Sequence, residues 1–296
     1  MRAPHTTDLA GVDAAVYGIP FDTATSYRTG ARFGPEAIRS ASALLRPYNP
    51  ALEVNVVETL SIVDYGDVPV SPGDTGRTYG QVGEALAPLV EAGVFPLALG
   101  GDHSVTLAEL RVLARGGPLA LVQLDAHGDT WEEYFGQRFF HGTTFKRALE
   151  EELIAPAASV QAGLRGSLYG AEDVESAREL GFTVLSCDEL CTLGAERYGE
   201  LVRERTGDRP VFLSFDIDVL DPAFAPGTGT PEAGGLSTAE ALAFLRALRG
   251  IRLAGADVVE VSPPYDGPGQ PTALAAANVA YELLCLRALT RSGSAA

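Results

Sequence analysis

Three short polar clusters contain three of the four histidines in this 296-residue chain. Gly100-Gly-Asp-His-Ser104 follows the apolar run Val94–Leu99, and Asp125-Ala-His-Gly-Asp129 follows the apolar run Leu119–Leu124. The third cluster, His141-Gly-Thr-Thr-Phe145, lies a loop further on. Ligands bind at the carboxyl ends of strands in open α/β sheets, so polar residues that directly follow apolar strands indicate a functional site.

A fourth cluster adds carboxylates to the same pattern. Ser214-Phe-Asp-Ile-Asp-Val-Leu-Asp-Pro222 closes the apolar run that begins at Val211. Side chains alternate between two faces in extended chain, so Ser214, Asp216 and Asp218 are expected to share one face. The same alternation applies to the 125–129 cluster wherever it is extended. Two strand ends therefore direct four carboxylates and an imidazole into one region.

Such a cluster predicts a metal site. Its candidate ligands are two histidines and four aspartates, namely His103, Asp125, His127, Asp129, Asp216 and Asp218. Four crowded carboxylates repel one another unless cations lie among them, and two divalent ions would balance their charge. Carboxylates and imidazoles without thiolates favour an ion such as Mn²⁺ over a structural Zn²⁺. Paired ions can acidify a shared water and polarise a substrate, so hydrolysis is the expected reaction and a purely structural site is the weaker alternative.

Short apolar runs alternate with helix-like segments along the whole chain, which is the pattern of a mostly parallel sheet covered on both faces. The predicted strands are 14–19, 94–99, 119–124, 159–163, 182–186, 211–215 and 253–261. Helices are predicted over 36–45 next to Pro35, over 239–249 behind the capping box Ser237-Thr-Ala-Glu240, and over 272–289. Segments 68–77 and 262–271 are predicted loops. We expect one domain over 1–296, with 1–10 as a short flexible N-terminal segment.

Composition restricts compartment and partners. With 46% hydrophobic and 21% charged residues, the chain can bury a sizeable core. A net charge of −17 disfavours nucleic acid and membrane surfaces and attracts metal ions and basic small molecules, although high acidity also serves solubility alone. Three sparse cysteines favour structural thiols in a reducing cytoplasm. Neither a signal peptide nor a membrane-spanning segment is expected.

The clusters resemble the motifs of the ureohydrolases, the arginase and agmatinase family. The similar segments are GGDHS at 100–104, DAHGD at 125–129, SFDIDVLDPAFAPGTGTPEAGG at 214–235 and DVVEVSPPYD at 257–266, together with the amino-terminal segments 18–22 and 28–35. The resemblance covers nearly the whole chain. It implies an arginase-like three-layer α/β fold with a parallel sheet of about eight strands, helices on both faces, and assembly as a homotrimer or homohexamer.

The same resemblance implies two Mn²⁺ ions per subunit and attack of a metal-bridging hydroxide on a guanidinium carbon. Asp125 and Asp216 would bridge the two ions. The other four ligands would divide between the ions, as His103 with Asp129 and as His127 with Asp218. Asp129 would also orient the hydroxide.

Further roles follow from the resemblance outside the ligand set. His141 corresponds to a proton-shuttle histidine that protonates the departing amine, for which an imidazole is suited. Glu260 would accept hydrogen bonds from the guanidinium, since a planar cation with N–H groups pairs well with a carboxylate. Asp102, Ser214 and Asp221 would orient ligands or fix turns.

Segment 130–140 bears on the substrate. Arginases bind the amino acid end of arginine through an Asn- and Ser-rich stretch that this segment lacks, and Thr130 and segment 262–266 look more like agmatinases. Agmatine, cleaved to putrescine and urea, is therefore the expected substrate, with Glu132 or Glu133 near its ammonium and with Trp131 and Tyr134 in cation–π contact. Arg138 instead favours a carboxylate tail, as in 4-guanidinobutyrate or 3-guanidinopropanoate. A non-catalytic metal-binding homologue is a further alternative, but the chain retains every ligand.

Overall fold

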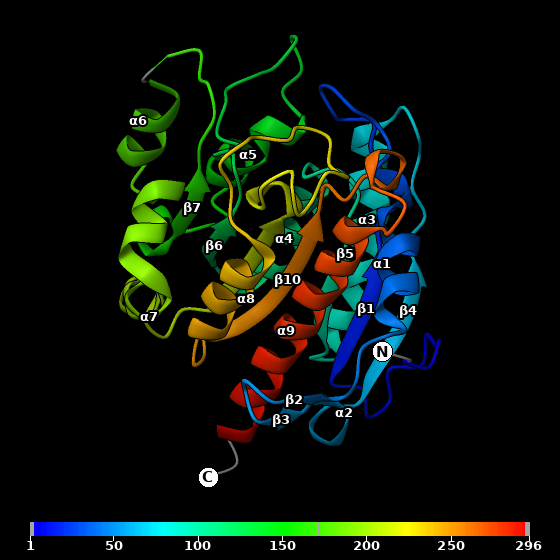
Figure 1. Ribbon diagram of the computed structural model, residues 1–296. Helices are drawn as coiled ribbons and strands as arrows, with labels where there is room; N and C mark the ends of the chain where they lie inside the picture. Colours follow the sequence, from blue (N-terminus) through cyan, green and yellow to red (C-terminus); the bar gives the residue numbers. More distant parts are fainter. Residues whose placement is uncertain (1–2, 171, 294–296) are drawn as a thin grey trace.

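The computed structural model describes residues 3–170 and 172–293 and has a parallel sheet of eight strands at its centre (Figure 1). The strands lie in the order β4-β1-β5-β10-β9-β6-β7-β8. Their bounds are β1 Ala14–Gly18, β4 Ile62–Asp67, β5 Phe95–Leu99, β6 Ala120–Leu124, β7 Val160–Leu164, β8 Thr183–Ser186, β9 Val211–Asp216 and β10 Leu253–Val259. Every neighbouring pair is parallel, so the predicted parallel sheet is confirmed.

Helices cover both faces of the sheet and produce the three predicted layers (Figure 1). One face carries α1 Gly34–Ser42, α7 Cys187–Thr206, α8 Thr238–Ala247 and α9 Pro271–Gly293, whose apolar side chains share one core cluster. The other face carries α3 Thr75–Glu91, α4 Val105–Leu113, α5 Thr144–Glu150 and α6 Glu172–Glu179. The short α2 Val56–Thr59 and the antiparallel pair β2 Tyr48–Asn49 and β3 Val54–Asn55 pack near α9.

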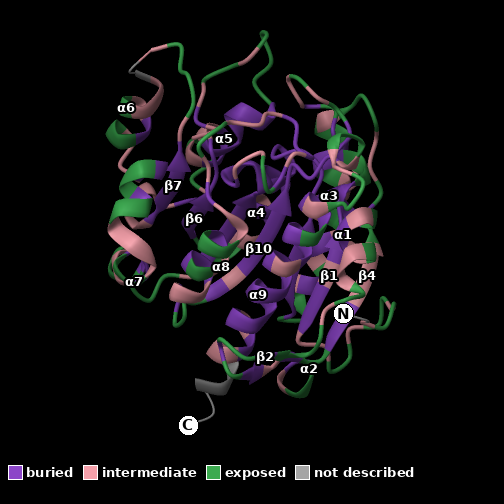
Figure 2. Cartoon of the chain, in the orientation of Figure 1, coloured by how far each residue is buried: buried purple, intermediate pink, exposed green. Residues whose placement is uncertain are grey.

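Burial on both faces explains why the central strands are continuous apolar runs in the sequence. Every residue of β5, β6, β7 and β9 is buried, as the purple strands in Figure 2 show. Side chains alternate between the two cores: Leu97 and Leu99 face the α1 and α9 side, and Ala98 faces the α3 and α4 side. The strand ends that carry the polar clusters therefore extend from tightly packed backbone.

Besides the small pair β2 and β3, which the sequence prediction did not include, two elements of the main layers differ from that prediction. β4 is missing from the predicted strands because it lies at the edge of the sheet, where only its first two residues are buried and polar residues interrupt the apolar run. α3 begins at Thr75, inside the predicted loop 68–77, because the Asp74 side chain caps it by accepting the Arg77 backbone N–H at 2.9 Å. The capping box of Ser237 and Glu240 is present at the start of α8, as predicted.

The two ends of the described chain pack against the sheet. Within the described residues, segment 271–290 of α9 is long and apolar enough to cross a membrane by length and composition alone, yet 78% of that window is buried inside the protein, as in a core helix. At the other end, the Asp64 backbone of β4 bonds to the carbonyl of Pro4 at 2.9 Å and to the N–H of Thr6 at 3.1 Å. Part of the segment that we expected to be flexible is thus hydrogen-bonded along the sheet edge.

Candidate metal and active site

The predicted site residues lie at the carboxyl ends of four neighbouring strands. β5 leads into the turn at 100–104, β6 into 125–129, β9 into the 3₁₀ turn Ile217–Val219, and β10 into Glu260. These strands are adjacent and parallel, so their ends meet at one edge of the sheet. The first turn packs so tightly against the 19–21 segment that a Cβ on Gly101 would lie 1.7 Å from the Phe21 carbonyl oxygen, which explains the glycine there.

One group of donor atoms surrounds the Nδ1 atom of His103. This nitrogen lies 3.1 Å from Asp125 Oδ2, 2.9 Å from Asp129 Oδ2 and 3.2 Å from Asp216 Oδ2. It nevertheless makes no hydrogen bond of acceptable geometry within the described residues. A buried imidazole nitrogen and three carboxylate oxygens around one point form a donor set that suits a divalent cation.

A second group is centred on His127 and shares one ligand with the first. His127 Nδ1 lies 3.0 Å from Asp218 Oδ2 and 3.6 Å from Asp125 Oδ1. Asp125 therefore presents one oxygen to each group, as a bridging carboxylate would. The structure brings all six predicted ligand side chains together, and the two groups lie side by side.

Turns rather than extended chain aim these side chains. β9 ends at Asp216, whose Oδ1 accepts the backbone N–H of Asp218 at 2.8 Å and thereby caps the 3₁₀ turn Ile217–Val219. We expected strand alternation to place Asp218 on the same face as Asp216. This expectation is wrong, because a turn and not extended chain positions Asp218. Asp129 and Glu260 have left-handed backbones, with φ of 50° and 61°. Such strain in residues other than glycine is typical of functional sites.

Electrostatics supports the same assignment. Burial, together with repulsion from Asp218 and Asp125, raises the pKa of Asp216 well above its ordinary value. Burial and the nearby Glu260 likewise raise the pKa of Asp102 to about 7. Divalent cations would remove this penalty by neutralising the crowded oxygens. The residues present therefore fit a pair of cations by donor type, burial and charge.

Asp102 and Asp221 fix the backbone around the site. Asp102 Oδ2 accepts the backbone N–H of Ala24 at 2.9 Å, and its Oδ1 accepts that of Ser104 at 3.0 Å. Asp221 Oδ1 accepts the N–H of Ala223 at 2.9 Å, and its Oδ2 accepts that of Gly234 at 2.7 Å. These four hydrogen bonds agree with the turn-fixing roles that the resemblance implies for the two aspartates.

A buried hydrogen-bond chain orients His103 from behind. Ser214 Oγ lies 2.8 Å from His103 Nε2 and donates its single proton to Asp257 Oδ1 at 2.7 Å. The nitrogen must therefore donate to Ser214, which leaves Nδ1 with its lone pair toward the carboxylates. Asp257 Oδ2 also accepts the Thr106 hydroxyl at 2.5 Å. Sequence reasoning assigned an orienting role to Ser214 but missed Asp257.

The chain continues to two further buried groups. Burial and the neighbouring Asp257 raise the pKa of Glu109 well above its ordinary value. The Tyr17 hydroxyl donates a short hydrogen bond to Glu109. Polar groups from β1, α4, β9 and β10 thus support one imidazole.

Replacing Ser214 with alanine is expected to weaken metal retention about 10- to 100-fold, because the buried Nε2–H of His103 loses its acceptor and the tautomer is no longer fixed. Competition with a chelating indicator measures the effect. Thr106→Val also touches Asp257 but lies off the path to His103, and serves as the matched control with a smaller effect. Unchanged affinity in Ser214→Ala would contradict the orienting role.

Glu260 and His141 form a second buried pair. Glu260 Oε1 accepts the backbone N–H of His103 and the Nδ1–H of His141, each at 2.9 Å. His141 Nε2 accepts the backbone N–H of Ser26 at 3.1 Å. Glu260 Oε2 is buried and has no hydrogen-bond partner within the described residues, and a Cβ on Gly229 would lie 3.3 Å from it. One carboxylate oxygen therefore remains available as an acceptor.

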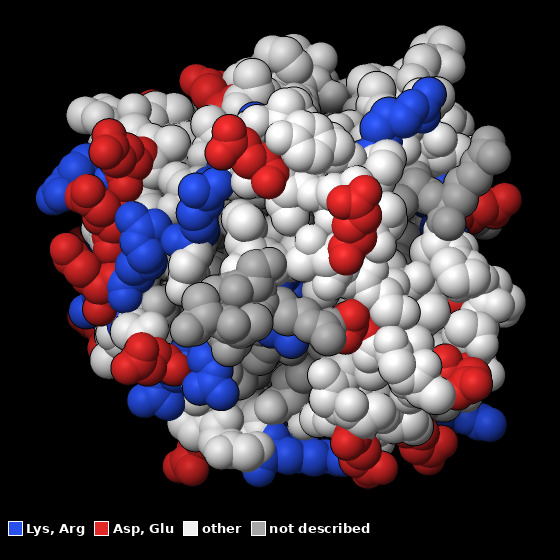
Figure 3. All heavy atoms as spheres, turned by 90° about the horizontal axis from the view of Figure 1, so that it is seen from below, with Lys and Arg blue, Asp and Glu red and all other residues white. Residues whose placement is uncertain are grey.

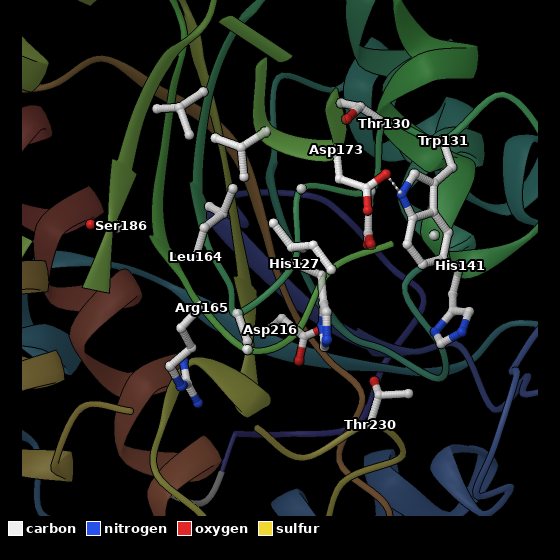
Figure 4. Close-up of a pocket in the computed structure, with 18 of the residues that line it drawn as sticks. His127, Thr130, Trp131, His141, Leu164, Arg165, Asp173, Ser186, Asp216 and Thr230 are labelled. Carbon is white, nitrogen blue, oxygen red and sulfur yellow. Dashed lines mark hydrogen bonds between the residues drawn. The ribbon is translucent and has the colours of Figure 1, made fainter. Parts of the chain in front are cut away.

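A cavity of about 330 Å³ opens on His141 and on part of the metal cluster, whereas the buried Glu260 does not line it (Figure 4). His127, Asp129, Asp216 and His141 contribute polar surface to its lining, and an apolar wall comes from Trp131, Tyr134, Leu164, Leu168, Val174 and Val184. Figure 4 shows Trp131 beside Asp173, whose Oδ1 accepts the indole N–H at 3.1 Å. The Trp131 ring also stacks on Tyr134 with 4.9 Å between centroids.

Two predicted substrate contacts lie elsewhere. Arg138 pairs with Glu150 at 2.8 Å and with Glu132 at 3.5 Å, and Glu132 also pairs with Lys146 and Arg147. Neither Glu132 nor Arg138 lines the cavity. This corrects their expected positions: they belong to an exposed ion-pair network over α5.

Several cavity residues were missed by sequence reasoning. Asp173 and Arg178 of α6 line the cavity, as do Ser26 and Thr230. No motif or spacing marks the two α6 residues, because α6 reaches the site only through the tertiary fold. Ser26 lies between the amino-terminal segments of the resemblance, so its position there was a weak signal.

Comparison with known proteins provides evidence on the family of this chain that does not depend on the geometry of the site. The family model described as the arginase family matches residues 12–285. The chain is 45% identical to guanidinopropionase from Pseudomonas aeruginosa over 296 residues, which cover 100% of this chain and 93% of that protein. It is 46% identical to agmatinase from Neisseria meningitidis, covering 93% and 87% of the two chains. The solved structure of proclavaminate amidinohydrolase from Streptomyces clavuligerus matches with a TM-score of 0.91 at 44% identity, covering 97% and 95%.

Proposed function

This chain belongs to the arginase family of hydrolases that release urea from guanidino compounds, and we propose that its substrate is agmatine, which it cleaves to putrescine and urea. The observation that supports this choice most directly is the Asp173 carboxylate beside the Trp131 ring in the cavity that the metal cluster lines. Agmatine carries a guanidinium at one end and an ammonium at the other. The cavity offers anionic groups for both.

The chain's own residues would bind and protonate the substrate. We propose His103, Asp125, His127, Asp129, Asp216 and Asp218 as ligands of two Mn²⁺ ions, which when bound supply Lewis acidity and an acidified water. Glu260 Oε2 would accept a guanidinium N–H. Burial alone would lower the pKa of His141, but Glu260 raises it overall. The ring would take up a proton at Nε2 once the Ser26 N–H leaves that atom, and would donate this proton to the leaving amine.

The tail of the substrate would lie along the aromatic wall. Trp131 and Tyr134 are stacked and face the cavity, so they would contact the aliphatic chain and the ammonium through their ring faces. Asp173 accepts bonds from the Trp131 indole and from the Tyr169 backbone N–H at 2.9 Å. Its carboxylate is thereby held in place for a cation.

A second candidate substrate class is the guanidino acids, because two arginines also line the cavity. Arg165 already donates to the backbone carbonyls of Asp218 and Glu232, which leaves Arg178 as the cation for a substrate tail. The nearest carboxylate to Arg178, on Glu189, is 3.8 Å away. A guanidinium held this loosely could pair with the carboxylate of 4-guanidinobutyrate or 3-guanidinopropanoate. Asp173 thus favours a substrate with a cationic tail, whereas Arg178 favours a substrate with an anionic tail.

A urea-release assay with Mn²⁺-loaded protein separates these substrates. With agmatine, Asp173→Asn is expected to lower kcat/KM about 10- to 100-fold, the effect of losing a charge-assisted contact. Arg178→Gln should leave agmatine turnover unchanged or raise it. Arg138→Ala is the matched control, because Arg138 lies outside the cavity, and it should not alter the ratio of agmatine to guanidinobutyrate turnover.

The opposite pattern identifies the second substrate class. In that pattern the protein turns over guanidinobutyrate faster than agmatine, and guanidinobutyrate turnover falls in Arg178→Gln but not in Asp173→Asn. We would then assign a guanidino acid as the substrate in place of agmatine. No urea from any guanidino compound would reject the proposed function altogether.

A further inference from the structure

A second cavity, which the urea-releasing reaction does not use, lies at the opposite end of the sheet. Its volume is about 440 Å³, and it is lined at the starts of β5, β6, β9 and β10, close to Phe95, Leu119, Pro210 and Leu253. The carboxyl ends of these same four strands carry the metal cluster. The two cavities are therefore separated by the length of the central strands.

The charged residues of this second cavity are all cationic. Arg209, Arg252 and Arg287 line it, and no aspartate or glutamate does among the described residues. This contrasts with the whole chain, in which 39 acidic residues outnumber 22 basic ones. Figure 3 looks on to this end of the molecule and shows blue groups recessed near the middle of the face. Three guanidinium groups at one cavity repel one another unless an anion lies between them.

The three arginines are also poorly paired. Within the described residues none of them forms an ion pair with a carboxylate. Arg209 Nη1 donates to the Pro118 carbonyl at 2.9 Å, whereas the bonds of Arg252 Nη1 to Asp208 O and of Arg287 Nη1 to Leu253 O are long, at 3.5 and 3.4 Å. Most of their N–H groups thus remain available for a ligand.

Arg287 provides the strongest single indication. Its Nε is buried without a hydrogen-bond partner, and its guanidinium lies over the Phe95 ring at 5.5 Å from the centroid. A buried guanidinium N–H that lacks an acceptor is costly, and proteins usually satisfy such groups. An oxyanion in the cavity would supply the missing acceptor.

We propose that this cavity binds a small organic oxyanion with two negative charges, of the phosphate monoester type, through Arg209, Arg252 and Arg287. The tetrahedral oxygens of a phosphate suit several arginine forks at once. The rest of the lining is largely apolar, with Val94, Phe95, Leu113 and Leu253, so the ligand would carry an apolar body. Such a ligand would bind at the amino-terminal ends of the strands whose carboxyl ends hold the metal cluster.

Calorimetric titration of the metal-loaded protein tests the proposal with three probes. Phenyl phosphate combines the charge and the apolar body, inorganic phosphate has the charge alone, and phenol has the body alone. We expect phenyl phosphate to bind most tightly, inorganic phosphate more weakly and phenol not measurably. Arg252→Gln and Arg209→Gln should each weaken phenyl phosphate binding about tenfold. Both side chains are exposed, so these variants should fold.

Matched controls separate this site from the metal cluster, which phosphate could also contact. Arg115→Gln removes the same charge from a nearby arginine that lies outside the cavity, and it should bind phenyl phosphate like the unaltered protein. Arg287→Met keeps the packing on Phe95, should weaken binding by a similar factor, and should not lower Tm without ligand. Phenyl phosphate affinity that survives in the Arg209→Gln/Arg252→Gln double variant, or no binding at millimolar concentration, would overturn the proposal.

Discussion

Asp216→Asn is expected to reduce urea release at least about a thousandfold and to lower the bound Mn²⁺ below two ions per subunit. Asp216 Oδ2 lies in the donor group around His103 Nδ1, whereas its Oδ1 accepts the Asp218 backbone N–H at 2.8 Å. The asparagine oxygen can keep that backbone bond, so the turn should survive. The change therefore removes a charged ligand from the site with little effect on the fold.

Thermal unfolding distinguishes a lost ligand from a damaged fold. Chelation should lower the Tm of the unaltered protein, because cations that bind the folded state stabilise it and because the crowded carboxylates then repel one another. In Asp216→Asn one of those charges is gone, so the chelated variant should be at least as stable as the chelated parent. Asp188→Asn, the same change at an exposed position, is the control for charge alone. Full activity of chelated, metal-free protein would disprove the metal assignment.

The metal cluster could be predicted because its ligands are contiguous with the strands that position them. His103, Asp125 and Asp216 each come within a few residues of a buried apolar run, and parallel strands bring such ends together. The turn that redirects Asp218 could not be predicted, since it depends on one side chain accepting a backbone N–H. The edge strand β4 was missed because it is only partly buried.

The cavity lining was harder to predict because it depends on contacts between distant elements. Segment 130–140 contains charged residues that we expected to contact the substrate tail. In the structure, however, Arg138 and Glu132 form ion pairs with Glu150 and Arg147 of α5, outside the cavity. Asp173 and Arg178 come from α6, which carries no motif. The sequence pattern therefore predicted the residues near the metal cluster. The residues near the substrate tail could be identified only from the tertiary structure.

Glu260→Gln is expected to lower kcat/KM about 100- to 10,000-fold while the bound metal stays at the parent level. The glutamine oxygen can replace Oε1 and keep the bonds from the His103 backbone and the His141 ring, which places an amide N–H where Oε2 now lies without a partner. That N–H would face the N–H groups of a guanidinium, so an acceptor becomes a repelling donor. Glu232→Gln, with Glu232 Oε1 4.0 Å from His127 Nε2 beside the same site, is the matched control and should change kcat/KM less than about threefold. Metal content distinguishes a lost substrate contact from a lost metal ion. If the Glu260→Gln protein keeps its ions and still turns over agmatine at the parent rate, Glu260 does not bind the substrate.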